Sequence, residues 1–381
     1  MINGKNQNSK TFLHFNKKSM IEIQFNWIFI LIVGVLILLF FIGLTNWYKE
    51  NEMRENSNNV KFMLQTVMTG ASINSRTASP IEIPKIEIDF NCDPNECGRE
   101  GCSSEFTFSK TGVSQDTSMD IIFSPKKIES DFMYVWSLDW NEPYKVSNFL
   151  YLSSPALKYY LVYKDGYPNS KKLAEKVFSK MSDNTLIKMK LIEDDEFEHI
   201  KYNNEYLVRL IRFYEGPGEN FGIDASPSML KEKKWDVVYI TGDEESGTIH
   251  YSRWSLTDNK NREKDPNKKT DYVGLSSLIG AIFTEDYDTY LCNMKKAYTK
   301  FKTVNEIYSI RSEKLLNTYI GDNKCEFLYG ASLQTSFTNI ENSLSNVNDI
   351  DNSDINVLLN SIEEIKSSNS DTVMKTCPRI Y

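Results

Sequence analysis

The chain contains six cysteines, and their type and spacing would allow disulfide bonding or metal binding. They are Cys92, Cys97, Cys102, Cys292, Cys325 and Cys377. An even number of cysteines is typical of disulfide pairing in an oxidising compartment, although the pairing itself cannot be deduced from spacing. We expect one bridge within the cluster of Cys92, Cys97 and Cys102 and one within the C-terminal region.

A metal site is the alternative for this cluster. The spacing is Cys92-x4-Cys97-x4-Cys102, whereas zinc sites favour closely spaced cysteine pairs completed by further cysteines or histidines. The chain has only His14, His199 and His250, and none is near the cluster in sequence. The pattern therefore favours disulfides over zinc.

Three other segments resemble functional motifs but lack the required context. Asp224-Ala225-Ser226-Pro227-Ser228 matches a DxSxS cation-binding pattern, yet no full helix fits between it and the strand expected at Trp235. Gly216-Pro217-Gly218 lacks the spacing and the lysine of a phosphate loop. The acidic run 193–196 with Glu198 is typical of a solvated face. The sequence predicts no cofactor and no catalytic site, and an enzyme is the less favoured class.

The elements that must position the cysteines begin with a transmembrane helix. Residues 25–44 contain no charge, and twenty helical residues span the roughly 30 Å hydrocarbon core of a bilayer. A buried helix of a soluble domain is usually shorter. A signal peptide would have a shorter apolar region and a small-residue cleavage site. Trp27 at one end and Trp47 with Tyr48 at the other fit the aromatic belts of a membrane helix over 25–47.

The distribution of positive charge predicts the orientation of this helix. The leader over 1–24 contains Lys5, Lys10, Lys17 and Lys18 and, up to residue 20, no acidic residue. Because loops rich in lysine and arginine stay in the cytoplasm, we expect a cytoplasmic N-terminus and an extracytoplasmic body. All six cysteines then lie on the oxidising side, which agrees with disulfide formation.

Composition limits the partners of the body. The net charge is −8 and the hydrophobic fraction is 40%, so the body can form a sizeable core and is acidic. Nucleic acid binding needs a basic surface, and nucleic acid is therefore excluded as a partner. The expected partners are the lipid bilayer, through 25–47, and a protein of the cell envelope.

Hydrophobic periodicity predicts a mixed α/β body with a helical C-terminal region. We expect a stalk helix and linker over 48–80, a β-rich segment over 81–155, an α/β domain over 156–285 and helices over 286–381. Strands are predicted at 157–163, 186–192, 205–214, 235–242 and 247–254, with a crossover helix at 170–181 that makes the first two strands parallel. The polar segment 256–270 is predicted to be a surface loop.

The N-terminal segment resembles a group of single-pass membrane proteins from small-genome archaea of the Nanoarchaeota and Woesearchaeota kind. The matching residues are Glu22-Ile23-Gln24-Phe25-Asn26-Trp27-Ile28-Phe29. FSP at 123–125, WSLDW at 136–140 and SNFLYLSSP at 147–155 also resemble that group. The resemblance implies an archaeal membrane protein and implies no particular activity.

The leader also resembles archaeal type IV pilin-like proteins, through Lys17-Lys18, Glu22 and a long helix that leads into a β-rich head. It departs from them because no glycine precedes the cleavage point. We therefore expect a membrane-anchored cell-surface structural or interaction protein. The alternatives are a pilin-like subunit of a filament or secretion complex, and an extracytoplasmic hydrolase.

Overall fold

The computed structural model divides into two compact units, Met1–Glu55 and Asn56–Tyr381. It describes residues 17–74, 78–83, 86–98, 101–167, 169–197, 207–214, 235–254, 262–322, 324–345, 350 and 352–381.

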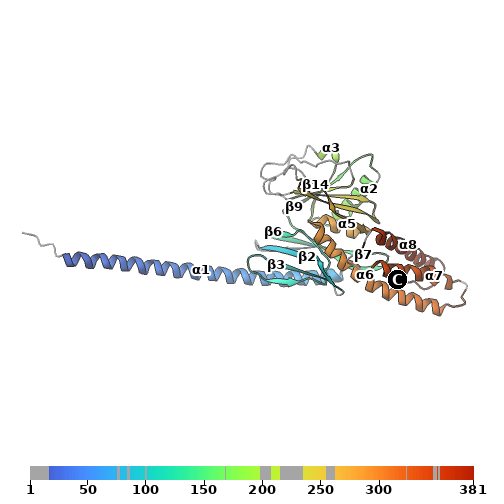
Figure 1. Ribbon diagram of the computed structural model, residues 1–381, viewed down its shortest axis with the longest axis horizontal. Coiled ribbons are helices and arrows are strands. Elements are labelled where there is room, and N and C mark those ends of the chain that lie inside the picture. The colour runs from blue at the N-terminus through green and yellow to red at the C-terminus, as the bar shows by residue number, and fades with distance from the viewer. Residues whose placement is uncertain are drawn as a thin grey trace, which may run out of the picture. The chain divides into compact units, whose positions relative to one another are not determined.

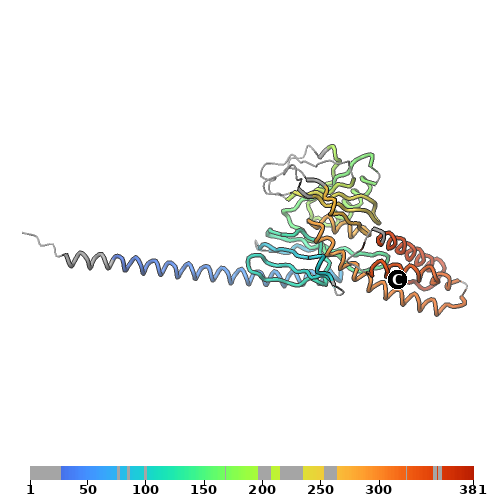
Figure 2. The backbone as a smooth tube through the Cα atoms, in the orientation of Figure 1, coloured from blue at the N-terminus to red at the C-terminus, as the bar shows by residue number. Residues whose placement is uncertain are grey.

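The first unit consists of the N-terminal part of a single long helix, α1 (Lys17–Ile73). Figure 2 shows the helical course of the coloured part of α1. Its large apolar side chains between Trp27 and Leu44 are exposed, and none of its most apolar stretch is buried within the protein. In a core helix of a soluble body such side chains are mostly buried, whereas here they are exposed. Among the described residues, α1 is the one helix long and apolar enough to cross a membrane, and near the N-terminus it could equally be a signal sequence.

The last turns of α1 belong to the second unit. Val60, Leu64, Met68 and Ala71 are buried there, at the spacing that puts them on one face of a helix. These positions form an apolar stripe on one face of the helix, whereas Met63 is 46% exposed. Strand β1 begins at Ala78, inside the segment expected to be a linker.

The β-rich part of the chain forms two four-stranded sheets. One has the order β1-β7-β8-β5 and the other the order β4-β3-β2-β6. The alternating isoleucines of the first strands, Ile81, Ile83, Ile86 and Ile88, are all buried. The strands are β1 (Ala78–Glu82), β2 (Glu87–Gly98), β3 (Gly101–Phe108), β4 (Ser114–Asp116), β5 (Ile122–Phe123), β6 (Lys127–Glu129), β7 (Phe132–Asn141) and β8 (Lys145–Ser153).

A third, six-stranded sheet follows, with the order β10-β9-β11-β12-β13-β14. The first four strands in this order are parallel to one another. Strand β13 pairs antiparallel with β12, and β14 pairs antiparallel with β13 and forms the edge of the sheet. The predicted crossover between parallel strands is confirmed. The elements are β9 (Leu157–Tyr163), α2 (Ser170–Ser182), β10 (Lys188–Glu193), α3 (Asp194–Phe197), β11 (Leu207–Arg212), β12 (Trp235–Gly242), β13 (Ser246–Trp254) and β14 (Arg262–Val273).

The prediction of a surface loop over 256–270 is wrong for residues 262–270, the part that the structure describes. Strand β14 begins at Arg262 and pairs with β13 across a register shift beside Ser252. An edge strand tolerates polar residues and proline because its outer side faces solvent and a bulge interrupts its hydrogen bonds. Pro266 lies within that interruption, between the paired Lys264 and Lys269.

The C-terminal region is helical, as predicted, and packs against the sheets. Helix α6 contacts strands of all three sheets, and Figure 1 shows α7 and α8 alongside its C-terminal half. The short helix α5, which periodicity does not predict, is buried on all sides except near its first turn. These helices are α5 (Gly274–Phe283), α6 (Tyr287–Thr318), η1 (Glu326–Tyr329), α7 (Ala331–Ser343) and α8 (Asn352–Met374).

One hydrophobic core joins most of the second unit. It extends in sequence from Ile121 to Ile380 and so crosses the expected boundaries at 155 and at 285. A second core lies between the two four-stranded sheets and the end of α1, and a third covers the other face of the six-stranded sheet. The body is a layered mixture of helices and sheets, which agrees with the predicted α/β class.

Candidate functional site

The candidate site lies where the β2–β3 hairpin meets helix α6. Strands β2 and β3 pair antiparallel, with Cys97 opposite Cys102 and Cys92 opposite Ser104. A register shift between Cys92 and Cys97 separates the two positions. Helix α6 packs on this hairpin and contributes Cys292.

Two disulfides are formed at this contact. Cys97 is bridged to Cys102 at the end of the hairpin, and Cys92 is bridged to Cys292, which is 200 residues away in sequence. Cys92, Cys102 and Cys292 are buried, whereas Cys97 is half-buried. The first disulfide closes the hairpin on itself, and the second ties the hairpin to α6.

The remaining bridge joins Cys325, which precedes η1, to Cys377 near the C-terminus. The expectation of one bridge within the cluster and one in the C-terminal region is confirmed. The bridge from Cys92 to Cys292 had no local signal in the sequence, because its partners are brought together only by the packing of α6 on the sheet.

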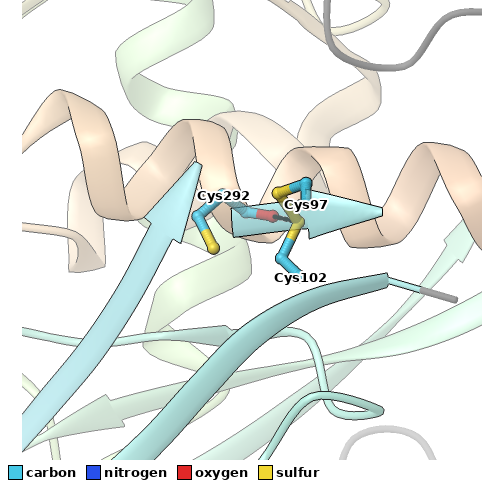
Figure 3. Close-up of side chains that lie close together, drawn as sticks. All are labelled: Cys97, Cys102 and Cys292. Atoms are coloured by element: carbon cyan, nitrogen blue, oxygen red, sulfur yellow. Dashed lines mark hydrogen bonds between the residues drawn. A yellow bond between two sulfur atoms is a disulfide. The ribbon is translucent and has the colours of Figure 1, made fainter. Parts of the chain in front are cut away.

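Sulfur atoms of the two neighbouring bridges lie close together. The Sγ atoms of Cys97, Cys102 and Cys292 are all within 4.8 Å of one another (Figure 3). Cys102 Sγ is also 3.5 Å from the backbone oxygen of Cys292. All the cysteines are bridged in this structure, so a set of metal-binding thiolates would require reduction of both disulfides. His250 lies on β13 in another sheet, and His14 and His199 lie outside the described residues.

Two buried lysines follow Cys292 by one helical turn. Lys295 donates a hydrogen bond to the backbone oxygen of Pro94, in the hairpin, at 3.0 Å. Lys296 donates to Ser104 Oγ at 2.7 Å and to the backbone oxygen of Asp120 at 2.8 Å. Their side chains place two amino groups between α6 and the sheet that carries the disulfides.

Burial controls the charge of these groups. Removal from water lowers the pKa of Lys296 to about 7, with an opposing contribution from Asp120. Burial also lowers the pKa of Lys300 and raises the pKa of the Asp120 carboxyl. A neighbouring cation favours the thiolate form of a cysteine, and thiolates are the reactive species in disulfide exchange. Because the pKa of Lys296 is about 7, its charge can favour a thiolate only near or below neutral pH.

A second polar cluster lies at the carboxyl ends of the parallel strands, the edge at which open parallel sheets often bind ligands. Asp194 accepts hydrogen bonds from Tyr214 and from Arg212, and its carboxylate is 3.3 Å from Lys164 Nζ. Because the charge of Arg212 is already paired within the protein, this cluster acts first as a structural ion pair. The expectation of a solvated acidic face is wrong for Asp194.

A groove of about 300 Å³ lies between α2 and the turn that joins β12 to β13. Its lining includes Lys172, Lys176 and Glu244, and Lys176 and Glu244 form an exposed ion pair at 2.8 Å. The groove brings together no set of groups suited to catalysis. The motifs at 216–218 and 224–228 lie outside the described residues.

No protein family, curated protein or solved structure matches this chain.

Proposed function

We propose that this chain is a membrane-anchored protein of the cell surface with a structural or interaction role. The N-terminus is cytoplasmic, a single helix over 25–47 crosses the membrane, and the bridged body lies outside. The observation that carries the proposal is the exposed apolar stretch of α1, which precedes a body in which every cysteine is disulfide-bonded.

The apolar stretch supports a lipid environment because none of the described residues of its own unit covers it. From Trp27 to Leu44 the large side chains are about half to three-quarters exposed. Burying one such side chain gains about 1.5 to 3 kcal/mol, and a bilayer supplies that gain without any protein partner. Disulfides persist in oxidising compartments, which supports placing the second unit outside the cytoplasm.

An interaction role agrees better than catalysis with the described surface. The described groove is lined largely by charged side chains, and the buried Arg209 and Arg212 each pair with a carboxylate of the same fold. The partner would be another protein of the envelope. On the basis of the sequence resemblance described above, the proposal also includes a small-genome archaeon as the source of the chain.

A pilin-like subunit is the second candidate. The specific observation in its favour is that α1 runs unbroken for 57 residues from the apolar stretch into the body. A filament would use the same exposed apolar stretch for contacts between subunits. Cleavage of the leader distinguishes the two candidates.

The test is to express the full chain in a host with a separate oxidising compartment. We expect the protein to stay in the membrane after alkaline extraction and to be digested by protease added outside intact cells. Its cysteines should react with maleimide only after reduction. Release by alkaline extraction, or free thiols in the freshly isolated protein, would overturn the proposal. A mass that lacks about the first nineteen residues would favour the pilin-like subunit.

A further inference from the structure

The two neighbouring disulfides differ in accessibility. Cys97 is the half-buried member of the four, and its bridge closes a loop of only five residues. Cys292 is completely buried, and its partner Cys92 is 7% exposed. A thiol from solvent therefore meets Cys97 before it meets any other sulfur of this pair.

We infer that these two disulfides form a thiol-capture site, in which an external thiol is bound covalently at Cys97 and the internal bridge moves from Cys92 to Cys102. The ligand class is a thiol, either a low-mass thiol or a cysteine of a peptide. This site goes beyond an interaction surface because the bond to the partner is covalent. It is independent of membrane orientation, so either proposal can fail without the other.

The first step opens the accessible bridge. The sulfur of the external thiolate attacks Cys97 Sγ, a mixed disulfide forms, and Cys102 leaves as a thiolate. Attack at Cys97 rather than at Cys102 follows from exposure, since Cys102 is only 2% exposed.

The second step follows from the distance between sulfurs. The Sγ atoms of Cys102 and Cys292 lie within 4.8 Å of each other (Figure 3), so the released Cys102 thiolate has Cys292 as a neighbouring disulfide sulfur to attack. A Cys102–Cys292 bond forms, the Cys92–Cys292 bond breaks, and Cys92 leaves as a thiolate. Cys92 then takes up the proton that the external thiol lost. No oxidant or reductant is consumed, because two disulfide bonds are present before the exchange and two are present after it.

Two lysine amino groups are held beside residues that flank these cysteines. Lys295 and Lys296 follow Cys292 on α6, and both are at most 7% exposed. Lys295 Nζ is held against Pro94, between Cys92 and Cys97 in sequence, and Lys296 Nζ is held against Ser104, two residues beyond Cys102. Burial lowers the pKa of Lys296 to about 7, so its positive charge, which would favour a thiolate, is lost as the pH rises above neutral, and the exchange depends on the sulfur geometry.

The rearrangement leaves the helix attached. Before exchange β2 is bridged to α6 through Cys92, and after exchange β3 is bridged to α6 through Cys102. Since β2 and β3 are paired to each other at this end, α6 remains tied to the same hairpin. The fold can therefore hold a captured thiol without losing its cross-link.

The test uses the Cys97→Ser variant of the full chain in detergent, with Cys377→Ser as the matched control. Cys97→Ser frees Cys102 beside an intact bridge, whereas Cys377→Ser frees Cys325, which belongs to a separate bridge. After incubation at mildly alkaline pH without added thiol, free thiols are trapped with iodoacetamide in denaturant, and peptides are mapped by mass spectrometry.

For Cys97→Ser we expect a Cys102–Cys292 peptide and alkylation of Cys92. For the control we expect alkylation of Cys325 alone, with the bridges of Cys92 and Cys97 unchanged. Cys97→Ser protein that keeps Cys92–Cys292 intact, with alkylation confined to Cys102, would overturn the inference.

A second measurement uses wild-type protein. It tests thiol capture even if the Cys97→Ser variant does not fold. Incubated separately with reduced glutathione and with a cysteine-containing peptide, it should acquire an adduct at Cys97 together with the Cys102–Cys292 bridge. An adduct with only one of the two probes identifies which source of thiol the site accepts. Adducts at Cys325 or Cys377 and none at Cys97 would contradict thiol capture.

Discussion

Lys296 in helix α6 donates a hydrogen bond to Ser104 in strand β3, with 2.7 Å between Nζ and Oγ. The lysine is only 3% exposed, and it also contacts backbone oxygens of Thr117 and Asp120. One buried amino group thus joins the end of the β-rich segment to the long C-terminal helix. Its protonation is therefore linked to the stability of their contact.

We expect stability to rise with pH through this lysine. Burial lowers the pKa of Lys296 from 10.5 in the unfolded chain to about 7. Between these values the unfolded chain binds a proton that the folded chain does not, so the free energy of unfolding increases with pH, by at most about 1.4 kcal/mol per unit. Lys296→Met should flatten this rise in urea unfolding at pH 7, 8 and 9. Lys314→Met, on an exposed position of the same helix, should leave it unchanged.

The long-range disulfide should dominate the stability conferred by the bridges at the site. Chain-entropy arguments give about 5 kcal/mol for a loop of 200 residues and about 2 kcal/mol for a loop of five. Replacing both Cys92 and Cys292 by serine should therefore lower the free energy of unfolding more than replacing both Cys97 and Cys102. Denaturant titration measures both losses, and an equal loss in the two variants would contradict this ranking.

Asp194→Ala should destabilise the six-stranded sheet by about 3 to 5 kcal/mol. The substitution leaves the guanidinium of Arg212, which is 2% exposed, without its carboxylate. Glu244→Ala is the matched control, because its pair with Lys176 is about half exposed and is worth less than about 1 kcal/mol. Thermal or urea unfolding of the two variants tests the difference. A small effect of Asp194→Ala would mean that water already solvates Arg212.

Gly280→Ala should be destabilising although alanine favours helices. A Cβ at Gly280 would lie 2.8 Å from the ring of Phe123, in the core between α5 and β5, and overpacking of this kind costs about 1 to 3 kcal/mol. Gly70→Ala in α1 meets no atom within 4 Å and should stabilise its helix by up to about 1 kcal/mol. Opposite signs in the two unfolding measurements are the expected result.

Charges in the centre of the apolar stretch should prevent membrane retention. Arginine at a central position of a membrane helix costs about 2.5 to 3.5 kcal/mol, so Leu36→Arg combined with Leu38→Arg should cost about 6 kcal/mol. We expect the double variant to shift to the soluble fraction after alkaline extraction. Phe62→Arg, at a position 70% exposed on the same helix, should remain in the membrane. Retention of the double variant would show that another part of the chain holds it there.

Elements with one clear hydrophobic period were predictable. Strand β9 has the predicted bounds, and α2 and β12 match the predicted segments to within one residue. Each of these three elements buries one or both of its faces, so its apolar residues follow a regular spacing that can be detected in the sequence. A bridge within the C-terminal region was also expected, although the sequence did not show which of its three cysteines would pair.

The elements that were missed owe their structure to their neighbours. Strand β14 is polar because it forms the edge of a sheet, and only its pairing with β13 makes it a strand. Helix α5 is apolar nearly all round because other elements surround it, and such a helix has no amphipathic period to detect.

What the sequence determined by itself is local: one long apolar helix, the alternation of strands and helices, and six cysteines that follow that helix. Those features depend on the chemistry of neighbouring residues, so they can be predicted without coordinates. The tertiary structure decided that Cys292 meets Cys92, that its sulfur lies beside Cys97 and Cys102, and that Lys296 reaches Ser104. These contacts join residues about 200 positions apart, and they arise because helix α6 packs across the sheet, which no local pattern encodes.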